Sequence, residues 1–148
     1  MARRLFERAC GRDPGYALAL AAIADCDAFL YLHFRSDASQ DTIMVNATRA
    51  LELQPELPTA HASLGLALQV QGRFAEAERE FETAVRLDPN LFEGWYFFAR
   101  LRFVQGRLDD AACLFERALD ANPDDFQSAG LLDQIYTSLG DTKLARAA

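Results

Sequence analysis

The sequence predicts an all-α fold, a solenoid of antiparallel helical hairpins that repeat along the chain. Two kinds of helix-breaking residue mark the repeat: four prolines are separated by 41, 34 and 34 residues, and three glycines are separated by 34 and 34. These residues are Pro14, Pro55, Pro89 and Pro123, and Gly72, Gly106 and Gly140. Between them, apolar residues recur every three or four positions, which is the period of a helix with one buried face.

The same prolines and glycines divide one predicted domain, residues 1–148, into five segments. The segments are 2–14, the second helix of an incomplete repeat; 16–57, a lengthened repeat; 58–91 and 92–125, two repeats in register; and 126–148, an incomplete repeat. Each complete segment reads as two helices separated by a break. The two ends therefore look unfinished, which predicts either a piece of a longer protein or a chain that caps itself by forming a dimer.

The lengthened repeat is seven residues longer than the others. Its first helix is expected at about 16–33 and its second at about 41–53, with the extra residues in a polar connector, 34–40. Asp37 or Ser39 is expected to cap the second helix, because a short polar side chain can accept a hydrogen bond from the first turn.

In the two central repeats a glycine follows the first helix, at Gly72 and at Gly106. Glycine can adopt the positive φ that ends a helix, and a proline presets the turn into the next one. The same reasoning places a third break at Gly140, with the start of a second helix over 143–148.

The two central repeats carry the residues of a known 34-residue signature at matching positions. They are His61, Leu64, Gly65, Leu68, Ala77, Phe81, Ala84 and Pro89, and then Trp95, Phe98, Ala99, Arg102, Ala111, Phe115, Ala118 and Pro123. This pattern resembles the tetratricopeptide repeat, although His61 and Arg102 depart from the usual residues. The resemblance implies a right-handed α-solenoid, the superhelix of that family.

Composition and charge exclude several classes of protein. The 148 residues are 51% hydrophobic and 25% charged, which is typical of a folded domain and not of a disordered chain. A net charge of −7 argues against a nucleic-acid partner, because such binding needs clustered Lys and Arg. The longest apolar run, 16–24, is about half the ~20 residues needed to span a bilayer, so no membrane partner is expected.

The cysteines favour a reducing, cytoplasmic setting, because three of them without CxxC spacing do not form a disulfide framework. Cys26 and Cys113 lie at helical positions that predict buried core thiols. A bacterial source is suggested by 14 Arg residues against a single Lys and by abundant Ala.

The sequence offers no convincing catalytic, metal or cofactor site. His61 lies at a core position of the repeat, and His33 ends an apolar helix where an imidazole can meet terminal carbonyls. Histidines and cysteines lie at no metal-ligand spacing. Glu76 and Glu80 are expected on a solvent-exposed helix face, where Arg79 can form modest ion pairs with them. No motif for nucleotide binding or hydrolysis is present, so we expect no enzyme and no cofactor.

The resemblance also implies a binding groove, since the first helices of such arrays line a concave surface. The residues expected to bind a partner there are Phe29, Leu66, Gln69, Val70, Tyr96, Phe97, Arg100, Phe103 and Gln134. Members of the family that grip the C-terminal carboxylate of chaperones use Lys, Asn and Arg at fixed groove positions. The matching residues here are Ala21, Asp25, Ser63, Glu93 and Phe97. None carries a positive charge, which argues against a chaperone tail as ligand.

The helix that starts near Trp95 is apolar around its whole circumference, unlike a surface helix with a single stripe. Tyr96, Phe97 and Phe103 must therefore pack either against a neighbouring helix or against a bound peptide or second subunit. The sequence leaves both alternatives open.

Two functions follow from these observations. The first is a non-catalytic interaction scaffold that binds a peptide or helical segment of a partner protein through an apolar anchor. The second is a regulatory or assembly segment of a larger bacterial signalling protein, next to a cyclase or DNA-binding domain, with self-association through the unfinished ends. The identity of the partner is not encoded in any of these patterns.

Overall fold

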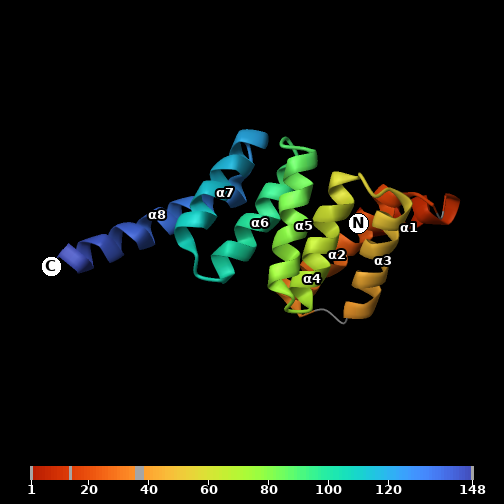
Figure 1. The fold of residues 1–148 in the computed structure, drawn as a ribbon, viewed down its shortest axis with the longest axis horizontal. Helices are drawn as coiled ribbons and strands as arrows, with labels where there is room; N and C mark the ends of the chain where they lie inside the picture. The colour runs from red at the N-terminus through yellow and green to blue at the C-terminus, as the bar shows by residue number, and fades with distance from the viewer. Residues whose placement is uncertain (1, 14, 36–38, 148) are drawn as a thin grey trace. The chain divides into compact units, whose positions relative to one another are not determined.

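The computed structural model describes residues 2–13, 15–35 and 39–147, which form eight helices and no strand (Figure 1). The helices are α1 (Ala2–Arg12), α2 (Ala17–Phe34), α3 (Gln40–Leu53), α4 (Pro58–Val70), α5 (Phe74–Leu87), α6 (Phe92–Val104), α7 (Leu108–Ala121) and α8 (Phe126–Ala147). The predicted all-α, helical-repeat fold is confirmed. The predicted helix at 16–33 is α2, and the one at 41–53 is α3.

The helices fall into two compact units, Met1–Pro89 and Asn90–Ala148. The first unit contains α1 to α5, and the second contains α6 to α8. The division comes at the end of the predicted repeat 58–91, close to its boundary with 92–125. The single domain over 1–148 stays a prediction, and each unit is described here by itself.

The hairpins α4–α5 and α6–α7 share one construction. Gly72 and Gly106 have φ of 75° and 73°, so each takes the left-handed conformation that ends the first helix. The amide N–H of the next residue, Arg73 or Arg107, donates to a carbonyl five residues earlier, at Leu68 or Arg102. The two predicted breaks are therefore confirmed, with the same turn at both.

Each hairpin buries one aromatic ring of its second helix completely. Phe81 of α5 and Phe115 of α7 are both 0% exposed. Gly65 of α4 lies directly on Phe81, since a Cβ at that position would come within 2.6 Å of the ring. In this hairpin the glycine therefore permits close approach of the two helices.

The ends of α2 and α3 show how the lengthened repeat closes. Arg35 ends α2 with a φ of 48°, and its N–H donates to the carbonyl of Leu30. Ser39 caps α3, because its hydroxyl accepts a hydrogen bond from the N–H of Thr42 at 3.4 Å. Of the two predicted caps, Ser39 is confirmed, whereas Asp37 lies outside the described residues.

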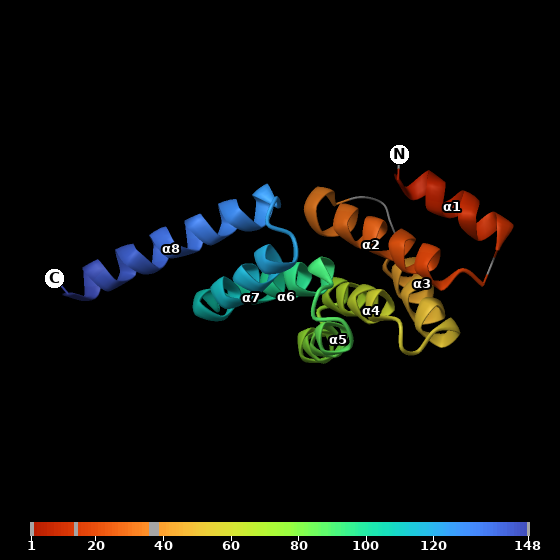
Figure 2. The same cartoon turned by 90° about the horizontal axis from the view of Figure 1, so that it is seen from above.

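The first unit also anchors α1 to α2 through charge. The guanidinium of Arg3 donates through Nε to Oδ1 of Asp27 at 2.6 Å, and it also pairs with Glu7. Asp27 is 5% exposed, and the hydrogen bond to it raises the pKa of Arg3. Because a buried carboxylate without a partner is strongly destabilising, this pair holds the first turn of α1 in place. Figure 2 shows α1 alongside α2 at the edge of the unit.

The break predicted at Gly140 is wrong. Helix α8 runs from Phe126 to Ala147 without interruption. In the two complete hairpins the second helix is held by a buried Phe nine residues after the glycine. A glycine by itself costs a helix only about 1 kcal/mol, which does not suffice to turn the chain.

Helix α2 is long and apolar enough to cross a membrane by length and composition, the one such helix among the described residues. It also packs against α1, α3 and α4, with buried alanines along its length. A core helix of a repeat passes the same test. The absence of a membrane partner stays a prediction.

Candidate functional site

In the first unit, the predicted groove residues lie on α2 and α4 and differ in accessibility. Leu66 and Val70 are buried, whereas Phe29 and Gln69 are half-buried. The ring of Phe29 contacts that of His33, with their centroids 4.3 Å apart. Oε1 of Gln69 is buried and accepts no hydrogen bond within the described part of the chain. Phe29 and Gln69 are thus the predicted residues of this unit that a ligand could contact most directly.

In the second unit, Tyr96 organises the predicted site. Its hydroxyl donates to Oε1 of Gln127 on α8 at 2.8 Å and accepts from Nη1 of Arg100 at 3.1 Å. The guanidinium of Arg100 also lies 5.8 Å from the centre of the tyrosine ring. Tyr96 itself is buried, so it fixes α6 to α8 and orients Arg100. Gln134 is exposed on α8.

The structure places all three aromatic side chains left open by the sequence against neighbouring helices. Tyr96 belongs to a core cluster with Phe115 and Ile135, and Phe97 and Phe103 pack against that cluster. The last two are only half-buried and leave part of each ring accessible. Packing therefore accounts for part of this apolar surface, and the role of the rest in binding stays a prediction.

His61 makes two polar contacts at the core position predicted for it. Its Nδ1 lies 2.7 Å from Oε2 of Glu80 on α5, and its Nε2 lies 2.9 Å from the carbonyl oxygen of Pro55. The imidazole thus connects α4 to its own second helix and to the turn before α4. These contacts assign a structural role to His61.

The remaining titratable candidates are mostly at the surface. Glu76 pairs with Arg73, whose hydrogen bond lowers the pKa of the exposed carboxylate. Cys26 is half-buried, and its burial raises the pKa of the thiol. The prediction of a buried Cys113 is wrong, because this thiol is exposed. An apolar period places a residue on a face but does not say how far a neighbouring helix extends over it. Cys10 lies outside the described side chains.

The described residues contain no group of three His, Cys, Asp or Glu side chains that could hold a metal ion. They do contain two hollows that the sequence did not single out. One, of about 320 Å³, lies between α3, α4 and α5 above Leu64 and Leu68. Of the charges around it, Glu76 is paired with Arg73 and Glu80 with His61.

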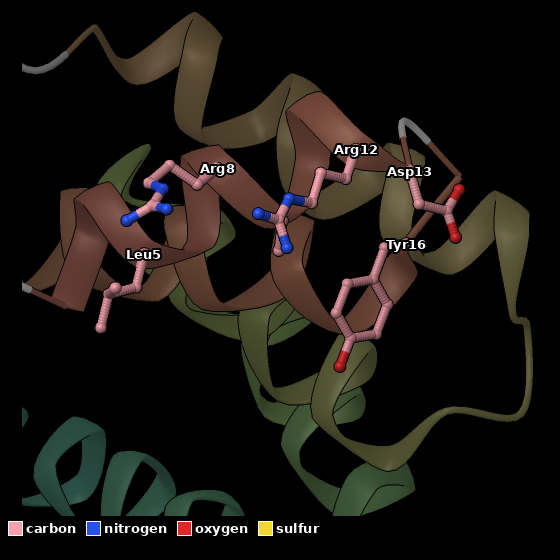
Figure 3. A pocket seen from close by; sticks show the side chains of 6 residues that line it. Leu5, Arg8, Arg12, Asp13 and Tyr16 are labelled. Carbon is pink, nitrogen blue, oxygen red and sulfur yellow. The ribbon is translucent and has the colours of Figure 1, made fainter.

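The other hollow, of about 450 Å³, lies on α1 and is called the α1 hollow (Figure 3). Four of its residues share one face of α1, and two come from the turn into α2. They are Leu5, Arg8, Ala9, Arg12, Asp13 and Tyr16. The spacing 5, 8, 9, 12 is the signal in the sequence that could have predicted it.

Comparison with known proteins decides the family. The sequence pattern of the tetratricopeptide repeat matches residues 46–92, 63–126 and 96–148, which together cover more than half of the chain. The chain belongs to the tetratricopeptide repeat family. The resemblance inferred from the spacing of prolines, glycines and apolar residues is thus confirmed.

Several known proteins are similar to this chain. The protein O-mannosyl-transferase TMTC1 of Mus musculus is 34% identical over 80 residues, which are 51% of this chain and 8% of that protein. The chain therefore spans a small part of the curated relatives it matches. The crystal structure of TTC0263, a tetratricopeptide repeat protein of Thermus thermophilus, has a TM-score of 0.72 at 20% identity, covering 91% of this chain and 71% of the other. These structural matches show the fold.

A further match is the first tetratricopeptide repeat domain of Spaghetti (RPAP3), solved with the HSP90 peptide SRMEEVD. Its TM-score is 0.65 at 22% identity, covering 84% of this chain and 94% of the other. At the positions matched to the chaperone clamp, this chain has Ala21 and Ser63 buried and hydrogen-bonded, since the Ser63 hydroxyl donates to the Ala21 carbonyl at 3.2 Å. Asp25 and Glu93 add negative charge.

Proposed function

We propose that this chain is a non-catalytic interaction scaffold that binds a segment of a partner protein on the first helices of its repeats. The observation that carries the proposal is the face of α6. There Phe97 and Phe103 leave parts of their rings accessible, and Arg100 is oriented by Tyr96. Half-exposed aromatic rings beside an arginine are the residue types that supply most of the affinity in protein interfaces.

The ligand class follows from the residues at the positions where chaperone-binding members of the family carry Lys, Asn and Arg. Ala21 and Ser63 are buried there, and Asp25 and Glu93 are acidic, so these positions offer no cation. An acidic C-terminal tail is therefore a poor ligand, and an apolar peptide or helix is a better one. The fold shared with peptide-binding members of the family supports this class of function. No observation specifically favours the bacterial signalling segment, so it stays an alternative.

The test begins with peptides selected from a random phage-displayed library on the immobilised chain. We expect the double variant Phe97→Ala/Phe103→Ala to weaken the selected peptides by at least about tenfold, because two aromatic anchors are removed. Both rings pack partly on the core, so this variant also loses about 1–2 kcal/mol per ring. Affinity is therefore measured by calorimetry at a temperature at which circular dichroism shows the variant folded.

Phe126→Ala is the matched control, because this ring is 89% exposed in the same unit and lies outside the predicted groove. The control should bind as the unchanged chain does, and the peptide SRMEEVD should show no saturable binding. Equal loss of affinity in Phe126→Ala and in the double variant would overturn the proposal.

A further inference from the structure

The hollow of about 320 Å³ between α3, α4 and α5 lies within the first unit and is called the α4 hollow. Figures 1 and 2 show α4 between the other two helices. Leu64 and Leu68, one turn apart on α4, form an apolar floor, and Leu68 is only 5% exposed. Met44 and Thr48 of α3 form one wall, and charged residues of α5 form the other. An apolar floor with a few polar groups at its edge is typical of a small-molecule site.

The other complete hairpin has larger side chains at the positions that form this floor. By the repeat spacing of 34, Leu64 and Leu68 correspond to Phe98 and Arg102 of α6. There the guanidinium of Arg102 lies 5.1 Å from the centre of the Phe98 ring, and both residues are buried. Two leucines fill less space than a phenylalanine and an arginine, and they bring no charge. The α4 hollow therefore follows from the residues of this particular repeat.

Both carboxylates beside the hollow already have partners in the first unit. Glu76 accepts from Nε and Nη2 of Arg73 at 2.9 and 2.6 Å, so this pair is bidentate. Oε2 of Glu80 lies 2.7 Å from Nδ1 of His61 on α4. Arg79 lines the same wall, and its guanidinium makes no hydrogen bond or ion pair within the described part of the chain. An anionic ligand would thus meet an available cation, whereas a cationic ligand would compete with existing partners for either carboxylate.

The wall formed by α3 is compatible with the same kind of ligand. The half-buried Thr48 makes no side-chain hydrogen bond among the described residues, so its hydroxyl can donate to an anion. Met44 is flexible and apolar, and such a side chain adapts to ligands of different shape. Neither residue adds a negative charge that would repel a carboxylate.

The dimensions of the hollow favour a small molecule over a segment of a protein. Its volume of about 320 Å³ is at the lower end of the range of roughly 300–1,000 Å³ for small-molecule pockets. Its floor extends from Leu64 to Leu68, which is about one helical turn. A helix or extended peptide would need a groove that continues over several turns.

We propose that the α4 hollow binds a small amphipathic carboxylate, with its hydrocarbon part on Leu64 and Leu68 and its carboxylate at Arg79. Medium-chain fatty acids belong to this class. The predicted groove residues Leu66 and Val70 lie on the opposite face of α4, by the geometry of the helix. The site is therefore separate from the proposed peptide groove, and it stands or falls independently of the proposed function.

The probe is octanoate, and its binding to the full chain is followed by two-dimensional NMR of the backbone amides. Octanol and octylammonium serve as ligands with the same hydrocarbon chain and a neutral or positive head. We expect saturable shifts in α3, α4 and α5, with octylammonium binding more weakly than octanoate. Arg79→Gln should weaken octanoate by about threefold and leave octanol unchanged, because only the ionic contact is lost.

A second variant tests the floor of the hollow. Leu64→Phe introduces the phenylalanine that α6 has at this repeat position, and it should fill the space that the hydrocarbon chain would occupy. We expect it to weaken octanoate and octanol alike by at least about tenfold. Circular dichroism shows whether the variant is folded at the temperature of the titration. Undiminished binding of both ligands to the folded variant would overturn the proposal.

Arg86→Gln is the matched control, because Arg86 is exposed on the same helix and does not line the hollow. It should leave the affinity for octanoate nearly unchanged. Equal weakening by Arg79→Gln and Arg86→Gln would reduce the effect to general charge attraction and overturn the proposal. The absence of saturable binding, or tighter binding of octylammonium, would do the same. Displacement of a library-selected peptide by octanoate would assign the hollow to the peptide groove and overturn it as a separate site.

Discussion

The hairpins α4–α5 and α6–α7 have the same backbone plan but fill it with different chemistry. One sets a glycine on a buried phenylalanine and joins its helices through His61 and Glu80. The other has Ala99 in place of Gly65 and joins its helices through Trp95 and Arg117. The repeat therefore specifies where a ring, a small residue and a polar partner must lie, and it leaves the type of contact free.

The largest effect should come from removing the buried rings. Phe81→Ala and Phe115→Ala should each lower the free energy of unfolding by about 3–5 kcal/mol, because each side chain is fully buried. Urea unfolding can be followed by far-ultraviolet circular dichroism for all helices and by the fluorescence of Trp95, the single tryptophan, for the second unit. A loss below about 1 kcal/mol in either variant would show that the hairpins do not share this anchor.

A smaller effect is expected when the small residue of the first helix is enlarged in one hairpin and shortened in the other. Gly65→Ala should destabilise α4–α5 by about 1–3 kcal/mol, because the new Cβ meets the ring of Phe81. Ala99→Gly should destabilise α6–α7 by about 1 kcal/mol through helix propensity and lost packing. Gly130→Ala is the matched control, since nothing lies within 4 Å of its Cβ position in α8, and it should raise the unfolding midpoint. A stabilising Gly65→Ala would contradict the close approach.

The smallest effect concerns the exposed pair at the start of α5. The hydrogen bond from Arg73 lowers the pKa of Glu76 below its ordinary 4.5 in the folded chain. A lowered pKa means that the stabilisation is present above the unfolded value and is lost as the pH falls through the folded value. Glu76→Gln should therefore lower the melting temperature slightly at about pH 6 and leave it unchanged at about pH 3. A difference that persists in acid would point to a cause other than this ion pair.

The sequence predicted the fold where local and tertiary signals agree. Gly72 and Gly106 are followed by second helices that carry their own buried anchors, so the predicted turns formed. At Gly140 the glycine gave the same local signal, but the helix continues through it. A glycine therefore predicts a turn reliably only when the sequence also shows the buried side chain that stabilises the following helix.

The candidate site was predicted less completely. The sequence placed Tyr96 on the correct helix but could not show that its hydroxyl joins α6 to α8 through Gln127. Cys113 was assigned to the core from its period, although it is exposed. The α1 hollow depends on how α1 and the turn into α2 lie together, and periodicity alone does not contain that information. Which particular side chains are buried therefore could be determined only from the structure.

The lengthened repeat has a practical consequence for protein engineering. The prediction that its extra residues lie in the connector is wrong, because most of them lengthen α2, which has 18 residues where α4 and α6 have 13. Ser63 of α4 still donates to the Ala21 carbonyl of α2 at 3.2 Å. Packing of the first half of α2 on α4 thus does not depend on α2 having the usual length. The residues of α2 after Phe29, which the other first helices lack, are accordingly the part of the repeat where an epitope tag should disturb this contact least.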